Sequence, residues 1–135
     1  MSFTRSPYFL RAVLLIDAAV SAATGLLLAL GGNLLEPWIG VPAMLTRGAG
    51  VSLLPFAVIV AYVATRPTLS RPAVWAMIVY NALWTIDSFA LLLSGWISPT
   101  ALGYAFVAAQ ALAVGVLAEL QYIGLRNVRA NVAGA

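Results

Sequence analysis

Four long apolar stretches, separated by short polar loops, fill nearly all of this 135-residue sequence. They lie at residues 8–30, 43–64, 72–93 and 100–124. Each has the roughly 20 residues that an α-helix needs to cross a hydrocarbon core about 30 Å thick. Strands of a transmembrane β-barrel would alternate polar and apolar residues, and these stretches do not alternate. The sequence therefore predicts an all-α fold, a transmembrane four-helix bundle.

Composition agrees with one membrane domain. Hydrophobic residues make up 63% of the chain and charged residues 8%, whereas a soluble domain has about 25% charged residues. We assign residues 1–125 to a single four-span domain and residues 126–135 to a polar tail. The pair Gly31-Gly32 and the single Gly95 follow apolar runs, so we expect helices to end there.

The basic residues predict the orientation of the spans. All seven are arginines. Only Arg47 falls on one side of a four-span arrangement, and six fall on the other: Arg5, Arg11, Arg66, Arg71, Arg126 and Arg129. Cytoplasmic loops of membrane proteins carry such an excess, which places both termini in the cytoplasm of a bacterial inner membrane. The net charge of +3 follows from these loops, so we expect membrane lipids and no nucleic acid as partners.

The chain contains no cysteine and no histidine. Their absence removes thiol redox chemistry, the common zinc and haem sites, and Ser-His-Asp catalysis. Neither a phosphate-binding loop nor a dinucleotide-binding fingerprint is present. We expect no metal, no cofactor and no enzymatic activity, with a lipid-modifying membrane enzyme as the third-ranked function.

The two halves of the sequence resemble each other. A shift of 64 positions aligns Asp17 with Asn81 and Ser21 with Thr85. Two tandem helical hairpins related by an axis along the membrane normal would produce such matches. Chance is the alternative, because alanine, leucine and glycine dominate all four spans. Both explanations stay open.

Several polar residues fall inside the apolar stretches. At 1.5 Å per residue, Asp17 and Asn81 each lie roughly 14 Å from the same end of their spans, and Gln110 lies near the middle of the fourth. An aspartate at a helix centre costs about 2.5–3.5 kcal/mol on insertion scales. We therefore expect a compact bundle with these side chains turned inward.

These polar residues have two interpretations. As a ligand-binding pocket, the set comprises Asp17, Ser21, Asn81, Trp84, Asp87, Ser88 and Gln110. Alternatively, Asp17 and Asn81 form a hydrogen-bonding clamp between helices, and Trp84 simply fills space. Intramembrane acids are often functional, so neither interpretation is discarded.

Matching by depth also predicts two ion pairs. Arg47 and Asp87 lie toward one face of the membrane, and Arg11 and Glu119 toward the other. The alternatives are that Arg47 reaches the headgroups by itself and that Glu119 is an interfacial residue.

Over its whole length the chain resembles the small bacterial four-span integral membrane proteins of unassigned function. The resemblance rests on three features: the early Asp17, the stripe of Asn81, Trp84 and Ser88, and the segment Gly124-Leu125-Arg126. From the residues we expect a non-enzymatic membrane protein that binds or translocates a small or lipid-like ligand or an ion. The alternative is an accessory subunit that acts as a homo-oligomer or with another membrane protein.

Overall fold

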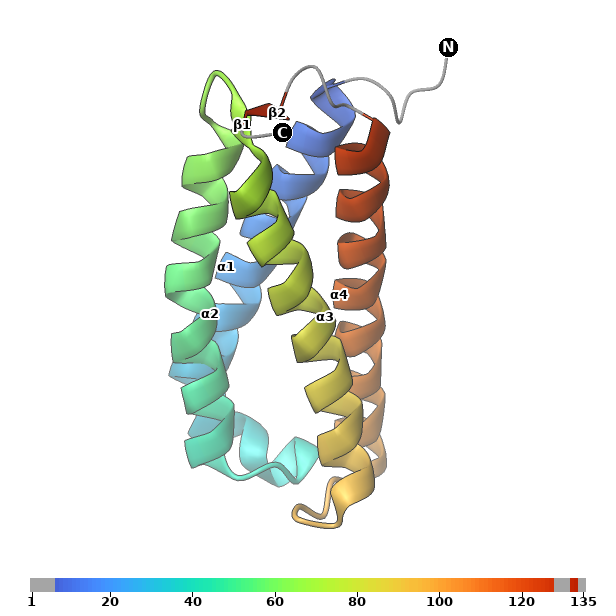
Figure 1. Ribbon diagram of the computed structural model, residues 1–135. Helices are drawn as coiled ribbons and strands as arrows, with labels where there is room; N and C mark the ends of the chain where they lie inside the picture. The colour runs from blue at the N-terminus through green and yellow to red at the C-terminus, as the bar shows by residue number, and fades with distance from the viewer. Residues whose placement is uncertain (1–6, 128–131, 134–135) are drawn as a thin grey trace.

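A computed structural model describes residues 7–127 and 132–133. Four helices form an antiparallel bundle (Figure 1): α1 Pro7–Ile39, α2 Ala43–Ala64, α3 Arg71–Ser94 and α4 Ala101–Asn127. All four are long and apolar enough to cross a membrane. The predicted all-α four-helix membrane bundle is confirmed.

The helices do not pack evenly around the bundle. α1 packs along α2, α3 packs along α4, and α1 also packs on α4. In contrast, α2 and α3 approach each other near their connecting turn and then diverge (Figure 1). About midway along α2 and α3, the rings of Phe56 and Tyr80 stack with centroids 3.9 Å apart. This divergence decides where the molecule has room for a ligand.

The first helix is longer than predicted. It continues through Gly31-Gly32 and ends only at Ile39, so the expected stop at the glycine pair is wrong. A Cβ atom on Gly32 would lie 2.7 Å from Cγ of Arg47 and 3.1 Å from the carbonyl oxygen of Ala43. Gly32 is therefore a helix contact, not a helix end. The chain turns at Gly40, whose φ of +71° favours glycine.

The other ends follow local signals. Ser70 caps α3, because its hydroxyl accepts a hydrogen bond from the Ala73 backbone N–H at 3.4 Å. Gly95 ends α3 with a φ of +78°, as predicted. The hydroxyl of Thr100 accepts from the backbone N–H of Gly103 at 3.0 Å, just where α4 begins.

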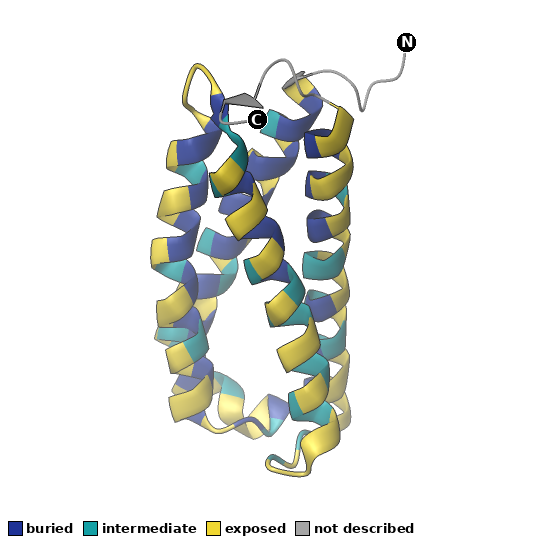
Figure 2. Ribbon diagram, in the orientation of Figure 1, coloured by how far each residue is buried: buried dark blue, intermediate teal, exposed yellow. Residues whose placement is uncertain are grey.

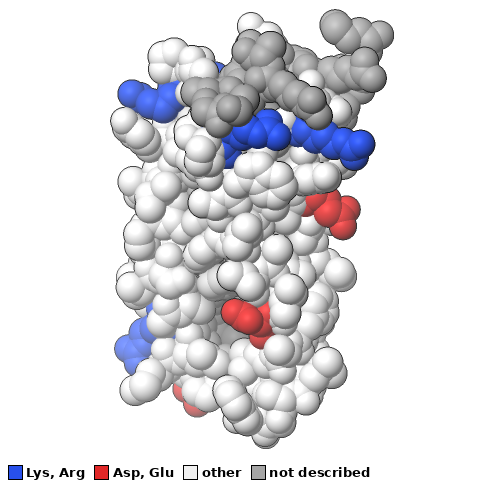
Figure 3. Space-filling model, in the orientation of Figure 1, with Lys and Arg blue, Asp and Glu red and all other residues white. Residues whose placement is uncertain are grey.

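The expected polar tail is partly structured. α4 continues to Asn127, and Val132–Ala133 (β2) pairs in parallel with Leu69–Ser70 (β1). Arg5 and Arg129 lie outside the described residues. We call the end of the bundle that carries Arg11, Arg66, Arg71 and Arg126 the basic end. The space-filling view shows basic side chains gathered there (Figure 3).

The apolar core is densest near the basic end. Large side chains from all four helices are fully buried there, among them Leu10, Leu14, Val60, Val74 and Leu125. Buried positions face the interior and exposed ones face outward along every helix (Figure 2). In a bilayer the outward apolar side chains meet lipid, as expected for spanning helices.

Glycines bring α1 and α2 into direct backbone contact. A Cβ atom on Gly50 would lie 2.3 Å from the backbone nitrogen of Ala29 and 2.7 Å from the carbonyl oxygen of Gly25. Small residues at such crossings allow the close approach that holds membrane helices together. Two residues earlier, a Cβ atom on Gly48 would have no atom within 4 Å.

We expect Gly50→Ala to destabilise the bundle, although alanine is the better helix former. Overpacking costs about 1–3 kcal/mol, which outweighs a gain of about 1 kcal/mol in helix propensity. The free energy of unfolding, measured by titrating sodium dodecyl sulfate into mixed micelles, reports the loss. Gly48→Ala is the matched control and should be neutral or stabilising. Equal stability of the two variants would contradict the backbone contact.

Candidate functional site

A polar cluster joins three helices in the half of the bundle near the basic end. Oδ1 of Asp17 on α1 accepts a hydrogen bond from Ser21 Oγ, one turn later, at 3.0 Å. Its Oδ2 accepts from Asn81 Nδ2 on α3 at 2.8 Å and from Gln121 Nε2 on α4 at 2.6 Å. Asn81 Nδ2 also donates to Gln121 Oε1 at 3.1 Å. We call these four residues the Asp17 cluster.

The Asp17 cluster is closed to its surroundings. Asp17 is 1% exposed, Asn81 2% and Gln121 0%. Both carboxylate oxygens already accept hydrogen bonds from inside the bundle. Satisfied polar groups of this kind stabilise a membrane protein, because hydrocarbon offers no partner. The expected contact between Asp17 and Asn81 is confirmed, and its geometry is that of an interhelical clamp.

Gln121 was missed by the sequence analysis. It lies 11 positions after Gln110 on α4, about three helical turns, so the two glutamines share a face. That spacing was the available signal. Gln110, which we expected beside Asp17, lies nearer the opposite end and belongs to a second polar group.

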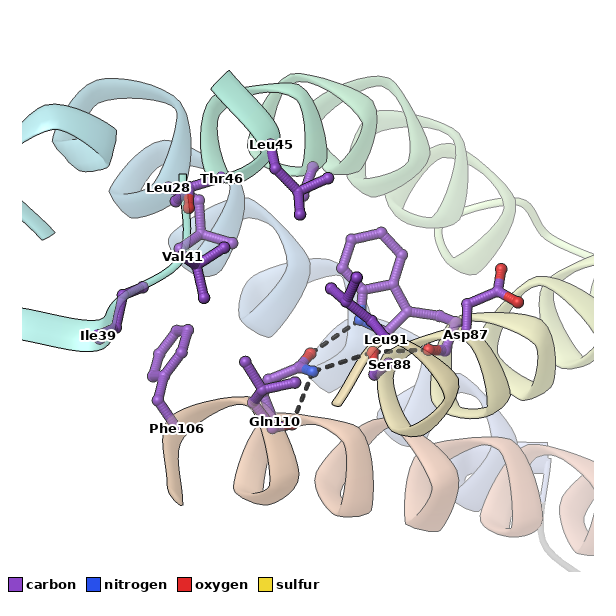
Figure 4. Close-up of a pocket in the computed structure, with 13 residues that line it drawn as sticks. Leu28, Ile39, Val41, Leu45, Thr46, Asp87, Ser88, Leu91, Phe106 and Gln110 are labelled. Carbon is purple, nitrogen blue, oxygen red and sulfur yellow. Dashed lines mark hydrogen bonds between the residues drawn. The ribbon is translucent and has the colours of Figure 1, made fainter. Parts of the chain in front are cut away.

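The second group borders a cavity of about 220 Å³ in the half of the bundle away from the basic end (Figure 4). The surface between α2 and α3 is hollowed beside an acidic side chain (Figure 3). All four helices and the α1–α2 loop contribute to the lining, which is mostly apolar. The lining residues are Leu28, Ile39, Val41, Leu45, Thr46, Ala49, Trp84, Asp87, Ser88, Leu91, Phe106, Val107 and Gln110.

Gln110 holds Trp84 in place at the cavity. The indole Nε1 of Trp84 donates to Gln110 Oε1 at 2.8 Å. Gln110 Nε2 donates to Ser88 Oγ at 3.1 Å and to the Val107 carbonyl at 2.8 Å (Figure 4). Ser88 Oγ in turn donates to the Trp84 carbonyl at 2.7 Å. These bonds join α3 to α4 and orient the indole ring.

An aromatic stack separates the cavity from the basic end on the α2–α3 side. Tyr80 stacks between Phe56 of α2 and Trp84, with centroids 3.9 Å and 6.1 Å away. Ser52 Oγ lies 3.3 Å from the Tyr80 hydroxyl and adds a polar contact between α2 and α3. Tyr80 is one turn nearer the basic end than Trp84, so the stack lies behind the cavity.

Asp87 differs from the other polar lining residues. It is exposed at the rim of the cavity, beside Ser88 and Leu91 (Figure 4). Within residues 7–127, its carboxylate has no hydrogen bond and no ion pair. Asp87 is therefore the polar lining residue whose side chain remains available to a ligand.

Neither predicted ion pair is formed in the described part of the chain. Arg11 donates instead to the backbone carbonyls of Ala64, Arg66 and Pro67, at 2.7 Å for Arg66 and 3.4 Å for Pro67. The carbonyls at a helix C-terminus lack partners and attract a cation, so the end of α2 outcompetes Glu119. Arg47 is exposed and lies over Gly32, away from Asp87.

The predicted pocket residues therefore form two sites. Asp17, Ser21 and Asn81 belong to the closed cluster, whereas the cavity takes the remainder: Trp84, Asp87, Ser88 and Gln110. Among the described residues, no group of three or more His, Cys, Asp or Glu side chains is placed to hold a metal ion.

No known protein family, curated protein or solved structure matches the chain. The interpretation of the site depends on its own geometry.

We expect Asp17→Leu to lower the free energy of unfolding by about 2 kcal/mol, because buried donors lose their acceptor. Asp17→Asn should cost much less. Its side-chain oxygen accepts from both Asn81 and Gln121, and its amide donates to Ser21 Oγ. Detergent titration followed by circular dichroism compares the variants. Equal losses for Leu and Asn, or no loss for Leu, would rule out the clamp.

Proposed function

We propose that this protein binds a small apolar molecule with a basic head, such as a lipophilic amine, in the cavity between the four helices. The observation that carries the proposal is the unpartnered carboxylate of Asp87 at the rim of an apolar cavity. A carboxylate at the rim of an apolar cavity, with no partner among the described residues, favours a ligand of opposite charge. We take the protein to be a binding protein and not an enzyme.

The size and lining of the cavity suit such a ligand. Its volume of about 220 Å³ exceeds the roughly 150 Å³ of an engineered apolar cavity that holds benzene. Trp84 and Phe106 offer aromatic surfaces, and a cation near an aromatic face gains about 0.5–2 kcal/mol. Because Gln110 fixes the indole of Trp84, the wall is preorganised and little entropy is lost on binding.

The same arrangement favours binding over translocation. Along the helices, the Asp17 cluster and the stack of Phe56 and Tyr80 lie between the cavity and the basic end. Passage of a ligand to that end would break the hydrogen bonds of the cluster. A binding role needs no such rearrangement.

We also propose that the protein resides in a bacterial inner membrane with both termini in the cytoplasm. Arg11, Arg66, Arg71 and Arg126 lie at the basic end, and Arg47, in the first turns of α2, lies toward the other. Basic residues accumulate on the cytoplasmic side of membrane proteins. The cavity would then lie in the outer half of the membrane.

One observation favours the alternative, an accessory subunit of a membrane complex. Glu119 is exposed on α4 beside a surface lined by Ile78, Ala118 and Ile123. It has no ion pair among the residues that the structure describes. A basic side chain from another membrane helix would satisfy it. Glu119→Gln should then weaken association with that partner and leave ligand binding at the cavity unchanged.

A matched series of eight-carbon probes tests the proposed ligand chemistry. Octylamine, octanol and octanoate are titrated into nanodiscs, with the fluorescence of Trp84 as readout in a variant whose other tryptophans are phenylalanine. We expect octylamine to bind about tenfold more tightly than octanol, since a charge-assisted hydrogen bond contributes about 1.5–3 kcal/mol. Octanoate should bind most weakly.

The matched variant is Asp87→Asn, which keeps the shape of the side chain and removes its charge. It should abolish the preference for the amine and leave the affinity for octanol unchanged. Asp17→Asn serves as the control and should bind all three probes as the parent does. An amine preference that survives Asp87→Asn, or that is absent from the parent, would refute the proposal.

Filling the cavity provides a separate test. Ala49 lines it from α2, and Ala49→Leu would place three more carbon atoms inside. We expect this variant to bind octylamine and octanol at least about tenfold more weakly, since the ligand loses its room. Ala105→Leu, on the exposed face of α4, is the control for added bulk. Unchanged binding in Ala49→Leu would exclude the cavity as the site.

A further inference from the structure

A second pocket lies at the basic end, where α3 begins and α4 ends. Its volume is about 370 Å³. The described residues that line it are two arginines, two aromatics and one leucine: Arg71, Arg126, Trp75, Tyr122 and Leu125. It is distinct from the cavity beside Asp87, which lies toward the opposite end.

Neither arginine has an acidic partner in the described part of the chain. Nη1 of Arg71 is buried and has no hydrogen-bond partner among the residues that the structure describes. Arg126 is exposed in the last turn of α4 and forms no ion pair with any residue between Pro7 and Asn127. A buried guanidinium nitrogen without an acceptor costs about 1–3 kcal/mol. An anion with several acceptor oxygens would supply the hydrogen-bond acceptors that these two guanidinium groups lack.

The aromatic residues indicate the depth of the pocket. Trp75 and Tyr122 pack edge to face, with ring centroids 5.7 Å apart, and both are exposed on the bundle surface. Tryptophan and tyrosine gather where the headgroups of a bilayer meet its hydrocarbon. A ligand held by the arginines would lie at the level of lipid phosphates.

We infer that this pocket binds a phosphate group, with Arg71 and Arg126 as its ligands. A guanidinium presents a planar fork of N–H donors that matches two phosphate oxygens. The N-terminus of α3, which starts at Arg71, adds the positive end of a helix dipole. Basic pockets between spanning helices bind anionic lipid headgroups in this way. An anionic lipid and a free phosphate share this chemistry.

The test compares lipids that share acyl chains. The delipidated protein in detergent is titrated with phosphatidylglycerol, phosphatidylcholine or inorganic phosphate, and native mass spectrometry counts what stays bound. We expect one tightly retained phosphatidylglycerol per chain. The double variant Arg71→Gln, Arg126→Gln should retain it about 30-fold more weakly, from about 1 kcal/mol for each arginine.

Arg66→Gln is the matched control at the same end. The Arg66 guanidinium lies over the ring of Tyr62, 4.4 Å from its centroid, outside the pocket. This variant should retain lipid as the parent does, and thermal unfolding checks that every variant is folded. Arg71→Lys, which keeps the charge but lacks the fork, should show an intermediate loss.

The outcomes separate the two sources of phosphate. Retention of phosphatidylglycerol that depends on Arg71 and Arg126 identifies a lipid site. If only inorganic phosphate binds, with the same dependence, the site serves a free phosphate. Binding that is equal in the double variant, or lost equally in Arg66→Gln, overturns the inference, as does the absence of binding by either anion. None of these results depends on ligand binding at Asp87.

Discussion

Hydrocarbon provides no hydrogen bonds, so Asp17 has to be satisfied from within the bundle, and that requirement organises three of the four helices. Its carboxylate accepts from Ser21 on its own helix, Asn81 on α3 and Gln121 on α4. Any rotation of α3 or α4 about its axis would withdraw a donor from the buried acid. The polar contact therefore determines how these helices face each other, which the many similar apolar side chains do not.

α2 takes no part in this cluster and is held by a different interaction. Gly25 and Gly50 let its backbone touch α1, and Arg11 of α1 binds the free carbonyls at its C-terminal end, including those of Ala64 and Arg66. Toward α3, its side-chain contacts include those of Phe56 and Ser52 with Tyr80, about midway along the helix. The bundle opens between α2 and α3 on the side away from the basic end, and the cavity lies in that opening.

The arginines at the basic end have unequal surroundings despite their similar topological positions. Arg11 is engaged with backbone carbonyls, and Arg66 lies over Tyr62. Arg71 has a buried nitrogen without an acceptor within residues 7–127 and 132–133. The positive-inside rule treats these arginines alike, because it concerns only the side of the membrane on which a charge lies. Their different chemistry arises only from what the fold places beside each one.

Hydropathy and residue type were sufficient to predict the four spans, the all-α bundle and the inward-facing Asp17 and Asn81, because burial in lipid imposes these properties on each helix separately. The same local signals failed at Gly31-Gly32, which resembles a helix end although α1 continues through it and Gly32 contacts α2. They also missed Gln121 and suggested ion pairs for Arg11 and Arg47 that the fold does not form. Depth along a helix can be counted from sequence, whereas the partner of a side chain depends on how neighbouring helices rotate and slide. The rotation and offset of the helices placed Asp17 in a cluster whose hydrogen bonds are satisfied and Asp87 beside an open cavity. Only the tertiary structure determined this difference.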